Sequence, residues 1–244
     1  MPRLSTFSHD GKSKNQPVLV SREVWMPPLG LAGTLNRPDG ARALVIFAHG
    51  SGSSRFSSRN IRVAEALNRR GIATLLFDLL LPQEADDREN VFDINLLAQR
   101  LKQAVGWVIE QPDINSFPIG LFGASTGAAA ALVAASGLGD RVGAVVSRGG
   151  RPDLAGDILP LVKTPTLLIV GGADYGVIEL NQHALERLGG EKSIQIVPGA
   201  THLFEEAGAL DAVIELAAGW FESHLVARDL CATKADPRKP DPRQ

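Results

Sequence analysis

The sequence predicts an α/β fold, with a doubly wound, mostly parallel sheet flanked by helices. Five short runs are almost entirely apolar, which is typical of strands that are buried on both faces of a parallel sheet. Between several of these runs, apolar residues recur at spacings of three and four and predict amphipathic helices. This alternation implies right-handed βαβ units, whose functional loops gather at the carboxyl ends of the strands.

The elements follow one another in a regular order. Two alternating segments, residues 17–26 and 30–38, predict an antiparallel pair of strands at the start. The buried strands are predicted at Ala43–His49, Ala73–Leu80, Phe117–Gly123, Val142–Ser147, Pro165–Gly172 and, shorter, Ser193–Gly199. Helical faces are formed by Ile61, Ala64 and Leu67, by Ile94, Leu97, Leu101, Val105 and Val108, and by Val213, Leu216, Trp220 and Phe221. The polar segment 81–90 is expected to be a solvated surface loop.

A single domain over residues 17–227 is the simplest organisation for a chain of 244 residues. The tails, residues 1–16 and 228–244, are polar or rich in proline and charge, and are predicted to be disordered. One cysteine, Cys231, permits no internal disulfide.

The composition excludes several classes of protein. A formal net charge of −2 argues against nucleic-acid binding. No apolar run is long enough to span a membrane, and the first residues lack the apolar core of a signal peptide. We therefore expect a cytoplasmic protein, monomeric or homodimeric, that acts on a small molecule. No cluster of His, Cys, Asp or Glu has metal-ligand spacing, so neither metal nor cofactor is expected.

The pentapeptide Gly123-Ala124-Ser125-Thr126-Gly127 fits the pattern G-x-S-x-G. It follows a predicted buried strand and precedes an alanine-rich helix, which is the context that a nucleophilic serine on a sharp turn requires. Larger residues at the two glycine positions would collide with the neighbouring strand and helix. The alternative is a small-residue turn that merely packs a helix on a sheet. A phosphate-binding turn is disfavoured because the chain lacks G-x-x-x-x-G-K-[ST].

A serine nucleophile needs a histidine base and an acid that orients it, in the chain order serine, acid, histidine. His202, in "PGATHLFEE", follows the last predicted strand and lies at the correct edge of the sheet. Asp174 follows the apolar run "LLIVGG" and is the predicted acid, whereas Asp153, after the preceding strand, is the rival. As alternatives, His202 would be a solvated loop residue and Asp174 a helix N-cap.

The oxyanion of an acyl-transfer reaction needs two backbone donors. The N–H of Thr126, directly after the nucleophile, is the first that we predict. The second is expected from the loop "HGSGSSR", at Ser51, with Gly52 as its nearest alternative.

The stretches "HGSGSS", "GASTG", the aspartate after "LLIVGG" and "PGATHLF" together resemble the α/β-hydrolase superfamily and, within it, the dienelactone-hydrolase-like group. The resemblance covers about residues 18–226 and implies the α/β-hydrolase fold. Dienelactone hydrolases proper attack with a cysteine, and Ser125 stands at that position here. The stretches "FDLL" and "SRGGRPDL" also resemble hydrolase domains that are fused to phosphoribosyltransferases.

Two further features bear on the substrate. Only the segment 151–164 separates two strands where many relatives carry a lid, so little or no lid and a fairly open pocket are expected. Arg55 and Arg59 follow the oxyanion loop, and Arg148 and Arg151 follow a strand near Ser125. If two of these four, such as Arg148 and Arg55, face the cleft, they could bind a carboxylate or phosphate of the substrate; otherwise they are solvated or paired with acids such as Asp153.

The sequence therefore predicts a serine hydrolase that cleaves a carboxylic ester or a related acyl bond through an acyl-enzyme. The first alternative keeps the triad of Ser125, His202 and Asp174 but acts on a thioester, a small amide or a carbon–carbon bond. The second alternative is a non-catalytic binding protein on the same fold.

Overall fold

The computed structural model describes residues 18–227. The predicted disordered tails, residues 1–16 and 228–244, lie outside the described residues. Eight strands form one sheet in the order β1-β2-β4-β3-β5-β6-β7-β8. The strands are β1 (Leu19–Met26), β2 (Leu31–Pro38), β3 (Ala43–Ala48), β4 (Ile72–Phe77), β5 (Ile119–Ala124), β6 (Val142–Arg148), β7 (Thr166–Gly171) and β8 (Lys192–Val197).

The sheet is antiparallel at one edge and parallel elsewhere, as the sequence predicts. β1 pairs with β2 and β2 with β4 in antiparallel register, and the remaining neighbours are parallel. After β1 and β2, the chain forms β3, then β4 on one side of β3, and then β5 on its other side. The carboxyl ends of β3 and β5 are thus adjacent where the strand order reverses, which is where open α/β sheets bind ligands.

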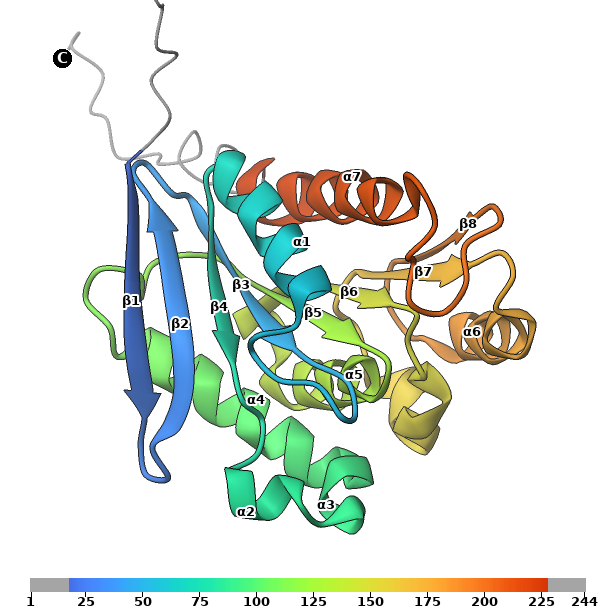
Figure 1. Cartoon of the computed structure of the whole chain (residues 1–244), viewed down its shortest axis with the longest axis horizontal. Coiled ribbons are helices and arrows are strands. Elements are labelled where there is room, and N and C mark those ends of the chain that lie inside the picture. The colour runs from blue at the N-terminus through green and yellow to red at the C-terminus, as the bar shows by residue number, and fades with distance from the viewer. Residues whose placement is uncertain (1–17, 228–244) are drawn as a thin grey trace, which may run out of the picture.

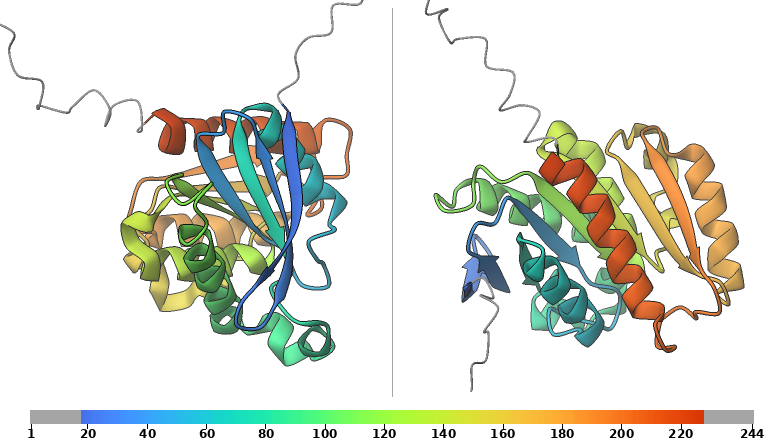
Figure 2. Two further views of the ribbon diagram at one scale, coloured as in Figure 1. Left: turned by 90° about the vertical axis from the view of Figure 1, so that its left-hand side faces the viewer. Right: turned by 90° about the horizontal axis from the view of Figure 1, so that it is seen from above.

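Helices cover both faces of the sheet, as Figure 1 shows, which makes three layers. The helical elements are α1 (Ser58–Arg69), α2 (Pro82–Ala85), α3 (Arg88–Phe92), α4 (Ile94–Ile109), α5 (Thr126–Leu138), η1 (Gly139–Arg141), η2 (Pro152–Leu161), α6 (Tyr175–Arg187), α7 (Ala209–Phe221) and η3 (Glu222–Val226). Seen from above, α1 and α7 lie side by side over one face (Figure 2, right), and α4, α5 and α6 cover the other.

Two apolar cores result, one on each side of the sheet. The side chains of β3 alternate between them: Leu44 and Ile46 pack toward α4 and α5, whereas Val45 and Phe47 pack toward α1 and α7. All six residues of β3 are buried, which is why its sequence is a continuous apolar run rather than an alternating one.

The segment 81–90 is not the unstructured loop that its polar sequence suggested, because it forms α2 and most of α3. Local capping explains the difference. The side chain of Glu84 accepts a hydrogen bond from the Leu81 N–H at 2.9 Å, and that of Asp87 accepts one from the Glu89 N–H at 2.9 Å. These caps satisfy N–H groups at the starts of two very short helices. The expectation of a small lid holds for 151–164, where the short helix η2 packs against α5 and α6.

Candidate active site

Ser125 occupies a sharp turn between β5 and α5. Its φ of +52° and ψ of −121° lie in a region that residues with side chains rarely adopt. Three backbone hydrogen bonds fix the turn: the Ser125 N–H donates to Arg148 O, and Ser125 O accepts from the N–H groups of Ala128 and Arg151. Such a strained strand-to-helix turn is the geometry that presents a serine hydroxyl at the edge of the sheet.

The two glycines of the pentapeptide allow this turn, for the steric reason that the sequence suggests. A Cβ atom on Gly123 would lie 2.4 Å from Ala128 Cα in α5, and one on Gly127 would lie 2.3 Å from the Ala48 carbonyl oxygen in β3. Both distances are far below van der Waals contact. The glycines therefore permit the close packing of α5 against β3 and β5.

His202 and Asp174 are in direct contact. The Nδ1 atom of His202, in the loop after β8, lies 2.7 Å from Oδ2 of Asp174, in the loop after β7. Asp174 stands at the N-cap position of α6, yet its side chain caps no N–H of that helix. The carboxylate is therefore available to accept the hydrogen bond of the imidazole.

The rival acid Asp153 has a different partner. Both of its carboxylate oxygens accept hydrogen bonds from the Arg151 guanidinium, at 2.8 Å each. The structure thus brings Asp174 to His202 and leaves Asp153 in a bidentate ion pair beside η2.

The loop that carries His202 is anchored two residues further on. Phe204 is buried at 1% exposure and has a φ of +55°, and its N–H donates to Thr201 O at 3.2 Å. No local sequence signal marks this position, because phenylalanine rarely adopts a left-handed conformation.

Two cavities meet at the loop that joins β3 to α1. The first, named here the polar cavity, has a volume of about 210 Å³ and is lined by Ser125, His202, Arg148, Asn60 and Arg59, among others. The second, named the apolar cavity, has a volume of about 340 Å³, and Thr126, Leu79, Leu80, Val91 and Leu97 contribute to its wall. Gly50, Ser51 and Ser53 border both cavities. Ser125 and His202 therefore share one cavity, and a second, mainly hydrophobic cavity adjoins it.

The two predicted oxyanion donors lie close together. Thr126 is the first residue of α5, so its N–H has no partner within the helix. The Ser51 N–H donates to the Thr126 hydroxyl oxygen at 3.0 Å. This contact, which the sequence did not indicate, fastens the loop after β3 to the residue that follows Ser125.

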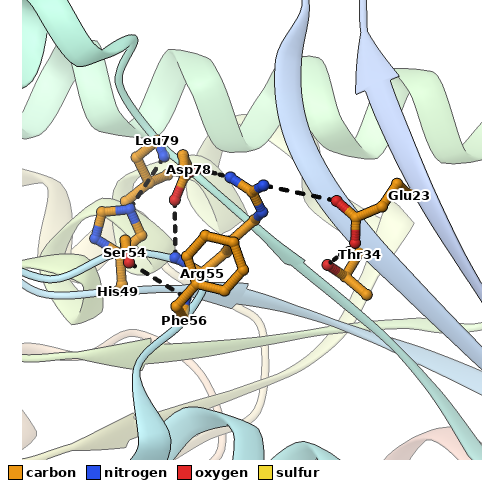
Figure 3. A network of polar contacts seen from close by, with 8 residues as sticks. All are labelled: Glu23, Thr34, His49, Ser54, Arg55, Phe56, Asp78 and Leu79. Carbon is orange, nitrogen blue, oxygen red and sulfur yellow. Dashed lines mark hydrogen bonds and ion pairs between the residues drawn. The ribbon is translucent and has the colours of Figure 1, made fainter.

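A network of polar contacts holds the other side of this loop, as Figure 3 shows. His49 Nε2 accepts a hydrogen bond from the Leu79 N–H at 3.1 Å, while Nδ1 lies 3.1 Å from Gly50 O and donates to it. Burial lowers the pKa of His49 below its ordinary value, which outweighs the opposite effects of the Gly50 carbonyl and of Asp78. His49 is therefore neutral at pH 7, and its two contacts fix its tautomer.

Arg55 belongs to the same network and lies away from Ser125. Its guanidinium forms an ion pair with Asp78 and lies 3.6 Å from Glu23 Oε2. The backbone N–H of Arg55 also donates to Asp78 Oδ1, at 2.8 Å. Of the two arginines that the sequence offers as possible substrate ligands, Arg55 is thus held by two carboxylates and does not line the polar cavity. Asp78, the aspartate of "FDLL", directly follows β4 at the carboxyl edge of the sheet. In the sequence, this position after a strand is the one indication that Asp78 has a role near the site.

Arg148, the other candidate, ends β6 and lines the polar cavity. It is 6% exposed, and its Nη2 atom lies 3.4 Å from Oδ1 of Asn60 in α1. Burial, with a smaller contribution from Arg59, lowers the pKa of Arg148 to about 10, so the side chain stays cationic at neutral pH.

Two kinds of feature are absent from residues 18–227. No group of three or more His, Cys, Asp or Glu side chains in this range is arranged to hold a metal ion. No helix in the same range combines the length and the apolar character needed to cross a bilayer.

Comparisons with known proteins agree on the family. Residues 31–219 match the sequence profile of the Dienelactone hydrolase family. A crystal structure of dienelactone hydrolase from Anabaena variabilis is 53% identical, with a TM-score of 0.82 over 86% of this chain and all of that one. Est1E from Butyrivibrio proteoclasticus has the same fold at 16% identity, with a TM-score of 0.71 over 85% of this chain and 99% of that one.

The chain is also similar to two curated Mycobacterium tuberculosis proteins, from two strains, that are provisionally named phosphoribosyl transferases. Each is 60% identical over 198 residues, which are 81% of this chain. The matched segment is 45% of those proteins, so this chain spans less than half of their length. With a family profile that covers most of the described residues and a solved relative that is 53% identical over 86% of this chain, the chain belongs to the dienelactone hydrolase family.

Proposed function

We propose that this protein is a serine hydrolase that cleaves a carboxylic ester of a small substrate through an acyl-enzyme. The observation that carries the proposal is the contact of His202 Nδ1 with Asp174 at 2.7 Å, beside the cavity that His202 shares with the strained Ser125. An ionised carboxylate only accepts hydrogen bonds, so Nδ1 carries the proton and Nε2 is free to act as a base.

In this mechanism Ser125 Oγ attacks the ester carbonyl carbon and gives its proton to His202 Nε2. Asp174 stabilises the imidazolium that forms. The carbonyl oxygen becomes an oxyanion, which the N–H groups of Thr126 and Ser51 bind together with the positive end of the α5 dipole. The Ser51 N–H shares its hydrogen between the oxyanion and the Thr126 hydroxyl oxygen, which holds this donor in place.

The tetrahedral intermediate collapses when the bond to the alcohol oxygen breaks and His202 returns its proton to that oxygen. Water then attacks the acyl-enzyme, giving a proton to His202, and the acid leaves while Ser125 regains its hydrogen. Each proton that is taken up is released, so the triad is unchanged after one turnover and needs no cofactor.

The name phosphoribosyl transferase belongs to proteins of which more than half lies outside the matched segment. We therefore propose ester hydrolysis, and not phosphoribosyl transfer, as the activity of this chain.

A fluorophosphonate probe tests the nucleophile directly. The wild-type protein should be labelled, and labelling should vanish in Ser125→Ala. Ser136→Ala is the control, because Ser136 lies near the other end of α5 and its hydroxyl donates to Val133 O. A folded wild-type protein that the probe does not label would point instead to a binding protein. A panel of p-nitrophenyl esters of graded chain length then tests ester cleavage and shows which acyl length the enzyme prefers.

A further inference from the structure

Arg148 is a buried cation without an anionic partner. It is 6% exposed, and it forms no ion pair with any acid in residues 18–227. Its Nε atom is buried without a hydrogen-bond partner in residues 18–227, and its Nη2 atom makes a long contact, 3.4 Å, with the Asn60 amide oxygen. An isolated buried charge is costly unless another group compensates it, so this arrangement calls for an anion.

The surroundings of Arg148 within the polar cavity add positive charge. Arg59 lines the same cavity and is close enough to lower the pKa of Arg148. The acid that Arg59 contacts is largely in solvent: Arg59 Nη1 lies 3.1 Å from Glu205 Oε1, and the Glu205 side chain is 65% exposed. The first turn of α1 also borders the cavity, through Ser57 and Asn60, and the positive end of a helix dipole favours an anion.

The positions of the two cavities indicate where the alcohol and the acyl group of an ester would bind. His202 must deliver its proton to the departing alcohol, so the alcohol lies on the side of His202, in the polar cavity. The apolar cavity is bordered by Thr126 and Ser51 and not by His202, so it lies beyond the oxyanion donors. Its side chains Leu79, Leu80 and Leu97 suit an apolar acyl group.

We propose that the substrate joins an apolar acyl group to an alcohol that bears a carboxylate or a phosphate, and that Arg148 and Arg59 bind this anion in the polar cavity. Asn60 orients Arg148 toward it. The proposal rests on the proposed hydrolysis by Ser125 and adds the class of leaving group. It keeps Arg148 from the sequence-based expectation and replaces Arg55 with Arg59, because Arg55 is already held by Asp78 and Glu23.

Matched aryl esters test the placement of the anion. The first pair is 3-butyryloxybenzoate and its methyl ester, which differ in the charge of the leaving group. A 3-butyryloxybenzyl phosphonate replaces the carboxylate and separates the two anions. In a second pair the leaving group is neutral: phenyl hemisuccinate carries a negative charge on the acyl group, and phenyl butyrate carries no charge.

We expect the anionic leaving group to raise kcat/KM about 10- to 100-fold over the neutral one, mainly through KM, as a charge-assisted hydrogen bond does. The hemisuccinate should gain nothing. In Arg148→Met the ratio of anionic to neutral ester should fall about 10-fold or more, and because both proteins meet the same compounds, differences in intrinsic reactivity cancel. Arg148→Lys keeps the charge and should retain part of the preference.

The control is Arg62→Met, which removes an exposed arginine of α1, the helix that carries Arg59 and Asn60; Arg62 is paired with Asp211. Its ratio should equal that of the wild type. An equal ratio in wild type and Arg148→Met, or a preference for the hemisuccinate, would overturn the proposal.

A binding measurement keeps the proposal testable without catalysis and without altering Arg148. Calorimetry on the Ser125→Ala protein should show that 3-hydroxybenzoate or 3-hydroxybenzyl phosphonate binds at least 10-fold more tightly than methyl 3-hydroxybenzoate. Equal affinities would refute the anion site even if the fluorophosphonate probe labels Ser125. Conversely, a strong preference for the acids with no labelling would support the anion site and refute the hydrolase.

Discussion

The hydroxyl oxygen of Thr126 lies 3.0 Å from the backbone nitrogen of Ser51 and accepts its hydrogen bond, which joins the turn at Ser125 to the loop after β3. Both residues are predicted oxyanion donors, so this side chain controls the separation between the two N–H groups. Thr126 is 3% exposed, which leaves its hydroxyl little freedom to rotate to another partner.

Thr126→Val should lower kcat for p-nitrophenyl butyrate about fivefold with little change in KM. The substitution keeps the shape of the side chain but removes a hydrogen bond of about 1 kcal/mol that positions the Ser51 N–H. Thr126→Ser retains the hydroxyl and should keep most of the activity. Steady-state kinetics on the three proteins checks this, and a valine variant with wild-type kcat would show that the loop is positioned without the hydroxyl.

Asp174→Asn should reduce kcat by about three orders of magnitude, because an amide in place of the carboxylate favours the wrong imidazole tautomer and no longer stabilises the imidazolium. Asp153→Asn is the matched control, since Asp153 pairs with Arg151 and not with His202. Its kcat should stay within about twofold of the wild type. Ester hydrolysis by both variants, with circular dichroism to verify folding, tests the assignment; a larger loss in Asp153→Asn would reverse it.

How far the sequence predicted the site follows from the kind of signal each residue leaves. The turn at Ser125 has a local steric signature in its glycines, and His202 and Asp174 follow apolar strands, so the edge of the sheet on which they lie could be predicted. The fold was predictable for the same reason, because buried strands and amphipathic helices have distinct periodicities.

Side-chain partners from distant segments leave no such signal. Arg55 and Arg148 are equally basic in the sequence, yet β1 and the loop after β4 each give Arg55 a carboxylate, while the end of β6 leaves Arg148 beside Asn60. The short helices α2 and α3 were missed because their stability comes from individual caps rather than from an apolar period. Side-chain partners from distant segments meet because of the order of the strands in the sheet. That order depends on the whole chain, so the local sequence around Arg55 or Arg148 does not reveal it.

Gly127→Ala should destabilise the protein by several kcal/mol, about 3 or more, because the new Cβ would lie 2.3 Å from the Ala48 carbonyl oxygen and would force α5 away from β3. Gly106→Ala is the control. Gly106 lies within α4, and apart from the neighbouring backbone of that helix no heavy atom lies within 4 Å of the added Cβ. It should raise the free energy of unfolding by about 0.5–1 kcal/mol, as alanine does in an exposed helix. Urea unfolding of both variants measures the two changes, and a stable Gly127→Ala protein would contradict the packing described for the turn.

The neutral state of His49 predicts how stability depends on pH. Burial lowers its pKa in the folded protein below the ordinary 6.5, whereas the unfolded chain takes up a proton near 6.5. Between the lowered pKa of the folded state and about pH 6.5, the unfolded state therefore binds a proton that the folded state does not, and the free energy of unfolding falls with decreasing pH by at most about 1.4 kcal/mol per pH unit. Above that pH the contribution of His49 is constant.

His49→Gln should remove this dependence, because glutamine does not titrate and its amide oxygen can still accept the hydrogen bond of the Leu79 N–H. Urea unfolding at several pH values between 7.5 and 5 should show a shallower decline for this variant than for the wild type. His183→Gln, at an exposed position on α6, should follow the wild-type curve. Parallel curves for the wild type and His49→Gln would mean that His49 gains a proton in the folded protein, and that its contacts with Gly50 and Leu79 do not hold the imidazole neutral.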